Sequence, residues 1–188
     1  MKRQQFFPVI IIATFLCVAV FSVLSCKKSN DMTAVAATLY DSLGGTAMVS
    51  DPANPGTKIE TGRLGLRSVV DSAIFVIAAD AKLNGFFKVL LAEVTANNTS
   101  GFVALSKNLT DFFCVATGAR NFAYSGKTML VAHDPAQNGR MNGKASSADF
   151  DQFITDLVVA ANKNKVPANL INSIGNLVNT LRGAVVQR

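Results

Sequence analysis

Four segments of the chain repeat apolar residues at the spacing of one face of an α-helix, and no segment alternates apolar and polar residues for long. The first segment covers 66–79 and the second covers 102–116. A third helix is expected to begin after Ser146, because a serine there can cap it. Pro167 fits the first turn of a fourth. The pattern predicts an all-α domain with four main helices and shorter helices between them.

Two polar stretches interrupt this pattern. Residues 50–65 are rich in proline, glycine and polar residues, and they separate a short first helix from the helix over 66–79. Residues 92–101 are also polar and precede the helix over 102–116. Because turn-forming residues gather in both stretches, we expect both to be surface loops.

The N-terminus has the order of a secretory signal peptide. Lys2 and Arg3 precede an uncharged, apolar run over 6–24, and the small residue Ser25 comes directly before Cys26. A small residue followed by cysteine resembles a bacterial lipobox, in which the cysteine is lipidated and becomes the new N-terminus. The alternative is an uncleaved anchor, because the run is about long enough to span a bilayer.

These features predict three parts of the chain. Residues 1–25 are expected to be a lipoprotein signal peptide and residues 26–35 a polar tether, followed by one domain over 36–188. The protein would then be a lipoprotein that is held on a membrane through lipidated Cys26 and faces the periplasm or the cell exterior.

The cysteines and the charge argue against a disulfide within the chain and against a nucleic-acid partner. Cys114 is the remaining cysteine of the folded part, so no disulfide within the chain is expected, and its apolar helical surroundings indicate a small buried hydrophobe. The formal net charge is +6, of which two charges lie in the leader. The basic residues are scattered and not interleaved with aromatic residues, so nucleic acid is not an expected partner.

His133 is the single histidine among 188 residues. The residues before it follow the spacing Y-x-G-[RK]-x-M-x-x-A-H, which is occupied by Tyr124, Gly126, Lys127, Met129, Ala132 and His133. Imidazole is the commonest side-chain ligand of metals in proteins. A lone histidine in a chain of this length is more often an ordinary surface or core residue than a ligand, and it is the spacing before His133 that favours a ligand.

This run is similar to the segment that enters the proximal histidine of the truncated (2-on-2) haemoglobins. Other fragments resemble that family in the same order: residues 38–45 resemble its opening LYxxLGG, and residues 69–71 and 80–83 resemble its second helix. Phe86-Phe87 resembles the phenylalanine pair that packs over the porphyrin, and residues 181–186 fit the last helix. The polar stretches over 50–65 and 92–101 and the lengthened segment after His133 would be insertions.

The resemblance, nearest to group I of the family, implies a globin-like 2-on-2 helical sandwich with inserted loops. It implies that haem b (iron protoporphyrin IX) is held with His133 as the iron ligand. The residues expected to contact the cofactor are His133, Phe86, Phe87, Ile74, Leu105, Leu109, Phe113, Tyr124, Lys127 and Met129.

The distal side departs from the family. By position, Ile74 replaces the usual tyrosine, Leu109 replaces a frequent glutamine, and Leu105 occupies the other main distal position. An aliphatic pocket offers no hydrogen-bond donor to oxygen, which forgoes about 1.5–3 kcal/mol of stabilisation. Carbon monoxide and nitric oxide are less polarised and are expected to lose less.

Two classes of function remain. The first is a haem protein that reversibly binds a diatomic gas (oxygen, carbon monoxide or nitric oxide) for carriage, sensing or redox chemistry such as nitric oxide oxidation, which would need an electron donor. The second is a haem-free globin-fold interaction or structural lipoprotein, which the missing polar distal residues and the insertions favour. Cysteine and histidine are too few for a zinc site, and no phosphate-binding glycine loop follows a strand. The retained His133, Phe86 and Phe87 favour the haem protein.

Overall fold

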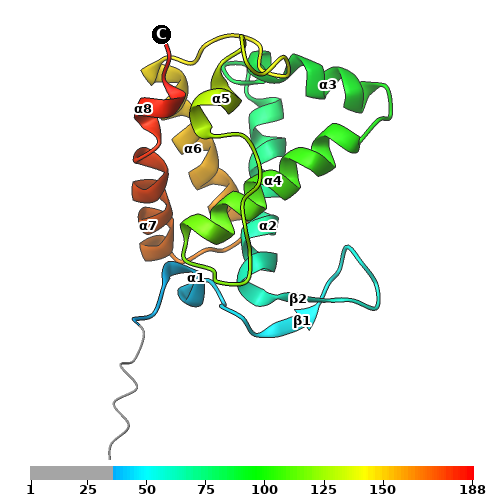
Figure 1. Cartoon of the computed structure of the whole chain (residues 1–188), viewed down its shortest axis with the longest axis vertical. Helices are drawn as coiled ribbons and strands as arrows, with labels where there is room; N and C mark the ends of the chain where they lie inside the picture. The colour runs from blue at the N-terminus through cyan, green and yellow to red at the C-terminus, as the bar shows by residue number, and fades with distance from the viewer. Residues whose placement is uncertain (1–35) are drawn as a thin grey trace, which may run out of the picture. The chain divides into compact units, whose positions relative to one another are not determined.

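The computed structural model describes residues 36–188, and these form one compact unit. Two short strands and a series of helices follow one another along this part of the chain (Figure 1). They are α1 (Leu39–Ser42), β1 (Met48–Ser50), β2 (Lys58–Glu60), α2 (Thr61–Ala79), the 3₁₀ helix η1 (Asn84–Phe87), α3 (Lys88–Thr95), α4 (Ser100–Ala116), α5 (Met129–His133), α6 (Ser147–Lys163), α7 (Ala168–Asn179) and α8 (Arg182–Val185).

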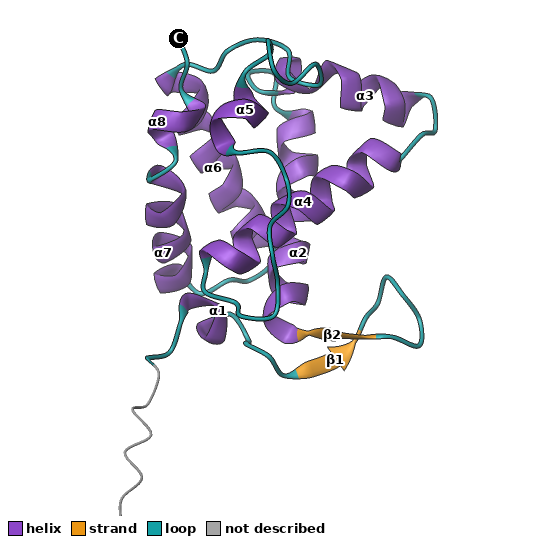
Figure 2. Cartoon of the chain, viewed as in Figure 1, coloured by secondary structure: helices purple, strands orange, loops and turns teal. Residues whose placement is uncertain are grey.

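The four main helices α2, α4, α6 and α7 pack against one another around the core. Helix α2 packs against both α4 and α6, and α6 packs against α7. Figure 1 shows α4 crossing α2, with α6 and α7 side by side beyond them. The four helices expected from the apolar spacing are therefore all present, and helices dominate the described residues (Figure 2).

The stretch over 50–65 is not a plain loop. Strands β1 and β2 pair antiparallel with Val49 opposite Ile59, and α2 already begins at Thr61. The Asp51 carboxylate holds the turn between them, because it accepts hydrogen bonds from the Ala53 amide at 2.9 Å and the Arg67 guanidinium at 2.6 Å. Each strand is only three residues long, too short for its alternation to stand out in the sequence.

The expected loop over 92–101 is also shorter than the sequence indicated. Helix α3 continues to Thr95 and α4 begins at Ser100, so the link is four residues long. Asn97 turns the chain there with φ +58°, a left-handed conformation that asparagine tolerates. The last predicted helix is divided, because α7 ends at Asn179 and α8 begins at Arg182.

Local capping and apolar burial explain the rest of the fold. Ser146 caps α6 as predicted: its hydroxyl accepts the Asp149 amide, and the Asp149 carboxylate accepts the Ser146 amide. The core draws side chains from α1, α2, α4, α6 and α7, among them Tyr40, Leu66, Val70, Phe113, Phe150, Leu157 and Val178. Cys114 belongs to this core, where burial raises the pKa of its thiol to about 11 and keeps it protonated.

The predicted signal peptide, the tether and Cys26 lie outside the described residues. Within residues 36–188, none of the helices has both the length and the apolar character needed to cross a membrane.

Candidate functional site

His133 ends the short helix α5, and its own helix positions the imidazole ring. Thr128 caps α5, because its side chain accepts the Val131 amide at 3.3 Å. One helical turn before His133 lies Met129, whose carbonyl oxygen is 2.8 Å from Nδ1 of the imidazole. A carbonyl can only accept, so Nδ1 carries the proton and donates it. This leaves Nε2 with a free lone pair.

The imidazole is partly buried. Burial lowers the pKa of His133 below its ordinary value, and the hydrogen bond to the Met129 carbonyl offsets part of that effect. The ring is therefore neutral at neutral pH. Neutral imidazole whose other nitrogen donates to a backbone carbonyl is the usual state of a metal-ligating histidine.

A close contact between Tyr124 and Gly126 explains why the motif has a glycine two residues after the tyrosine. The Tyr124 ring lies against Gly126, where an added Cβ would come within 2.5 Å of the phenol oxygen. The phenol donates a hydrogen bond to the Lys127 carbonyl at 2.6 Å. The other side of the ring meets Phe112 of α4 edge to face, with 5.5 Å between ring centroids. The glycine thus leaves room for the Tyr124 ring, which connects the segment just before α5 to helix α4.

Neighbouring segments hold α5 from both sides. Asn138 donates from its side-chain amide to the Ala132 carbonyl at 2.6 Å, and Gln187 donates to the Leu130 carbonyl at 2.9 Å. The Lys127 ammonium donates to the Gln137 carbonyl and to the Asn138 side chain, each at 3.1 Å. These bonds fix the direction in which His133 points.

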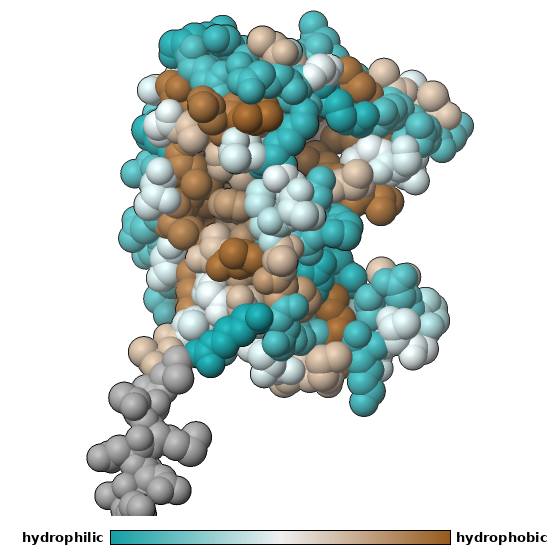
Figure 3. All heavy atoms as spheres, in the orientation of Figure 1, coloured by the Kyte–Doolittle hydropathy of each residue, from teal (hydrophilic) through white to brown (hydrophobic). Residues whose placement is uncertain are grey.

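The remaining predicted contact residues come from three other elements. Phe86 and Phe87 lie in η1, Ile74 lies in α2, and Leu105 and Leu109 lie one turn apart on α4. Phe86, Phe87, Leu105 and Leu109 are packed against the core but remain partly exposed, whereas Ile74 and Phe113 are buried. Figure 3 shows apolar residues gathered between α7 and the segment that leads from α4 to α5.

This arrangement fits an iron porphyrin. A flat apolar macrocycle needs apolar side chains that are not already covered, and Phe86, Phe87, Leu105 and Leu109 are partly exposed. It also needs one ligand atom, and Nε2 of His133 accepts no hydrogen bond from any residue in 36–188. In the same range, no group of three or more histidine, cysteine or acidic side chains lies together as a separate metal site.

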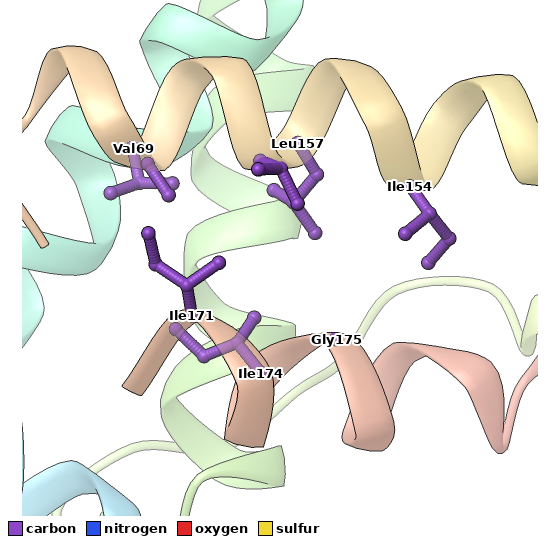
Figure 4. Close-up of a pocket in the computed structure, with 8 residues that line it drawn as sticks. Val69, Ile154, Leu157, Ile171, Ile174 and Gly175 are labelled. Atoms are coloured by element: carbon purple, nitrogen blue, oxygen red, sulfur yellow. The ribbon is translucent and has the colours of Figure 1, made fainter. Parts of the chain in front are cut away.

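A small recess lies between α2, α6 and α7, and none of the predicted contact residues lines it. It is lined by Val69 of α2, by Ile154, Leu157, Val158 and Ala161 of α6, and by Ile171, Ile174 and Gly175 of α7 (Figure 4). Its lining includes no residue from α4 or α5. All lining side chains are apolar, so the recess offers no polar group for chemistry.

Sequence reasoning missed several residues that position the site. The cap at Thr128 had a local signal, because threonine directly precedes an apolar helical run. The bonds from Asn138 and Gln187 had no local sequence signal, because each side chain reaches a carbonyl of α5 from outside that helix. The side-chain bond from Gln187 spans 57 residues of sequence.

Neither a scan against protein-family models nor a search of curated proteins finds a match to the sequence. Solved structures do match. Ferric mutant forms of the truncated haemoglobin from Tetrahymena pyriformis superpose with a TM-score of 0.57 at 21% identity, covering 81% of this chain and 100% of that protein. The 2/2 haemoglobin from a Synechococcus species, in the cyanomet state and with covalently attached haem, gives a TM-score of 0.56 with the same identity and coverage.

Residues 36–188 have the truncated-haemoglobin fold. The expectation of a globin-like 2-on-2 helical sandwich is therefore confirmed. At 21% identity the likeness concerns the fold alone, and the chemistry of this truncated-haemoglobin-like domain depends on its own residues.

Proposed function

We propose that the domain binds haem b, with Nε2 of His133 as the iron ligand, and takes up a diatomic gas. The observation that carries the proposal is the bond from Nδ1 to the Met129 carbonyl, which keeps the imidazole neutral and leaves Nε2 free. The solved structures with this fold include a haemoglobin with covalently attached haem, which supports haem binding here. By its motif spacing, the domain would belong near group I of the truncated haemoglobins.

Haem, when bound, supplies a ferrous iron that can take up oxygen, carbon monoxide or nitric oxide. The chain supplies the ligand from α5 and the apolar walls from α4 and η1. Leu105 and Leu109 of α4 and Ile74 of α2 exclude water and carry no hydrogen-bond donor. Because oxygen gains most from a donor, we infer that the pocket favours carbon monoxide and nitric oxide over oxygen, relative to a pocket that contains a phenol.

Substitution of His133 tests this proposal. In a titration with haem, the wild-type chain should bind one equivalent and develop a Soret band, and His133→Ala should lose this stoichiometric binding. Added imidazole should restore the spectrum of the variant. Leu130→Ala is the matched control, because Leu130 is an exposed residue of the same helix. Unchanged haem binding by His133→Ala would refute the assignment, and a colourless wild-type protein would favour the haem-free interaction module.

We also propose that Cys26 carries a lipid that holds the domain on a membrane, on the periplasmic or outer side. The support is the order of basic residues, apolar run, Ser25 and Cys26. Cys26→Ser should abolish labelling by a fatty-acid analogue and move the protein from the membrane fraction. Mass spectrometry that finds Met1 intact on the mature chain would contradict this. An electron donor is required in addition if the role is redox chemistry.

A further inference from the structure

The segment between α5 and α6, residues 134–145, forms a strap that starts directly after His133 and reaches α3 and η1. It is not helical, but turns brace it internally: the Asn138 and Gln137 amides both donate to the Asp134 carbonyl. Asn138 also ties the start of the strap to α5 through the Ala132 carbonyl. The proximal end of the strap is therefore fixed to the helix that carries the proposed iron ligand.

The middle of the strap is joined to α3 by an ion pair. Arg140 meets Glu93 with two parallel hydrogen bonds, Nη1 to Oε1 at 2.8 Å and Nη2 to Oε2 at 2.5 Å. The pair lies over Gly101 in the first turn of α4, where an added Cβ would come within 2.0 Å of Oε2. The glycine therefore makes room for the pair, which joins three elements at one point.

The far end of the strap is joined to η1. The Asn142 amide donates to the Phe86 carbonyl at 3.1 Å. Gly143 follows with φ +106°, a conformation that favours glycine, and an added Cβ there would lie 3.7 Å from the Phe86 ring. Phe86 is one of the phenylalanines that would cover the cofactor.

We propose that the Glu93–Arg140 ion pair is a latch that holds the strap closed between α5 and the wall formed by η1, α3 and α4, and so sets how fast the site opens. The effect of the latch on haem retention rests on the proposed haem site, whereas the latch itself does not. Opening would free Asn142 from Phe86 and separate the elements that carry the two sides of the site. Closing would retain a bound cofactor.

The latch is sensitive to salt. The Arg140 side chain is 50% exposed and the Glu93 side chain 23% exposed, so ions in solution screen the pair. Its bidentate geometry makes it stronger than a typical surface pair. Because of this geometry, removal of either partner should raise the frequency of opening by about three- to tenfold, around and above the upper end of the range for exposed pairs.

Hydrogen exchange on the chain without haem tests the latch directly. In Arg140→Ala and in Glu93→Gln, the Asn142 amide should exchange about three- to tenfold faster than in the wild type. The Gln137 amide, bonded within the strap, should change little. Arg67→Ala is the matched control, because it removes another bidentate arginine–carboxylate pair, the one with Asp51 beside the hairpin of β1 and β2, away from the strap. Unchanged exchange at Asn142 in both latch variants would overturn the proposal.

Gly101→Ala gives an independent perturbation that changes no charge. The new methyl group would displace Glu93 and Arg140, while alanine keeps α4 helical. We expect Asn142 to exchange faster in this variant also. High salt should accelerate exchange in the wild type towards the rate of Arg140→Ala and leave that variant unchanged, and a salt response of equal size in both would contradict the latch.

The rate of haem loss to an excess of a haem-scavenging protein tests whether the latch retains the cofactor. The latch variants should lose haem about three- to tenfold faster, with no further increase when both partners are replaced. If the wild type binds no haem, the proposed function fails and the exchange of Asn142 still decides the latch. If haem binds and is lost at the same rate in all variants, the role of the latch is refuted and the haem site stands.

Discussion

Replacement of Gly126 by alanine should destabilise the approach to α5 without removing any group that contacts a ligand. The backbone at Gly126 is not in the left-handed region, so alanine causes no strain of its own there. The strain comes from the new Cβ, which would lie 2.5 Å from the Tyr124 oxygen and 2.6 Å from the adjacent ring carbon. The ring must therefore move.

The structure sets the size of the effect. Movement of the ring breaks the bond from the Tyr124 hydroxyl to the Lys127 carbonyl, which contributes about 0.5–1.5 kcal/mol. It also disturbs the edge-to-face contact with Phe112, worth about 0.5–1.5 kcal/mol. The free energy of unfolding should therefore fall by about 1–3 kcal/mol, the sum of these two contributions.

Urea unfolding of the purified chain measures this change. Gly139→Ala is the control, because no atom lies near an added Cβ at that exposed position. Tyr124→Phe should reproduce only the part that belongs to the lost hydrogen bond. In a Tyr124→Ala background, Gly126→Ala should cost little, because the clash is gone. An equal cost of Gly126→Ala in both backgrounds would refute the explanation of the Y-x-G spacing.

Three further predictions concern the pocket and the response to pH. In the haem-loaded protein, Ile74→Tyr should slow oxygen dissociation about ten- to a hundredfold, because a phenol donates in a dry pocket; stopped-flow rates that do not differ would contradict the aliphatic pocket. Burial, with a further contribution from the charge of Asp80, raises the pKa of Asp156, one oxygen of which is buried without a hydrogen-bond partner in the described residues. The folded state therefore loses stability as pH rises through that raised pKa. Asp156→Asn should be more stable than the wild type by about 1–3 kcal/mol at pH 7 and equally stable in acid, where the wild-type carboxyl is protonated. Urea unfolding midpoints at the two pH values measure the difference. The pKa of His133 is lowered, so the apoprotein should lose stability as pH falls from about 6.5 through the lowered value; the same loss in His133→Ala would disprove this cause.

Much of the fold could be predicted from local patterns. The faces of α2, α4, α6 and α7 are visible in the sequence because helical neighbours lie three and four residues apart. The cap at Ser146 is visible for the same reason, since both partners lie within one turn. The spacing from Tyr124 to His133 pointed to the one imidazole that the fold leaves free at Nε2, although the haem itself stays a prediction.

Only the tertiary structure decides which distant segments of the chain contact one another. Glu93 and Arg140 are 47 residues apart, and neither residue type nor spacing indicates that they meet over Gly101. The hairpin of β1 and β2 depends on Arg67, which reaches back from α2 to the Asp51 carboxylate. In both pairs one partner lies on a helix and the other lies in the strap or in the turn after β1, so the packing of these elements, and not the order of residues along the chain, sets which partners meet.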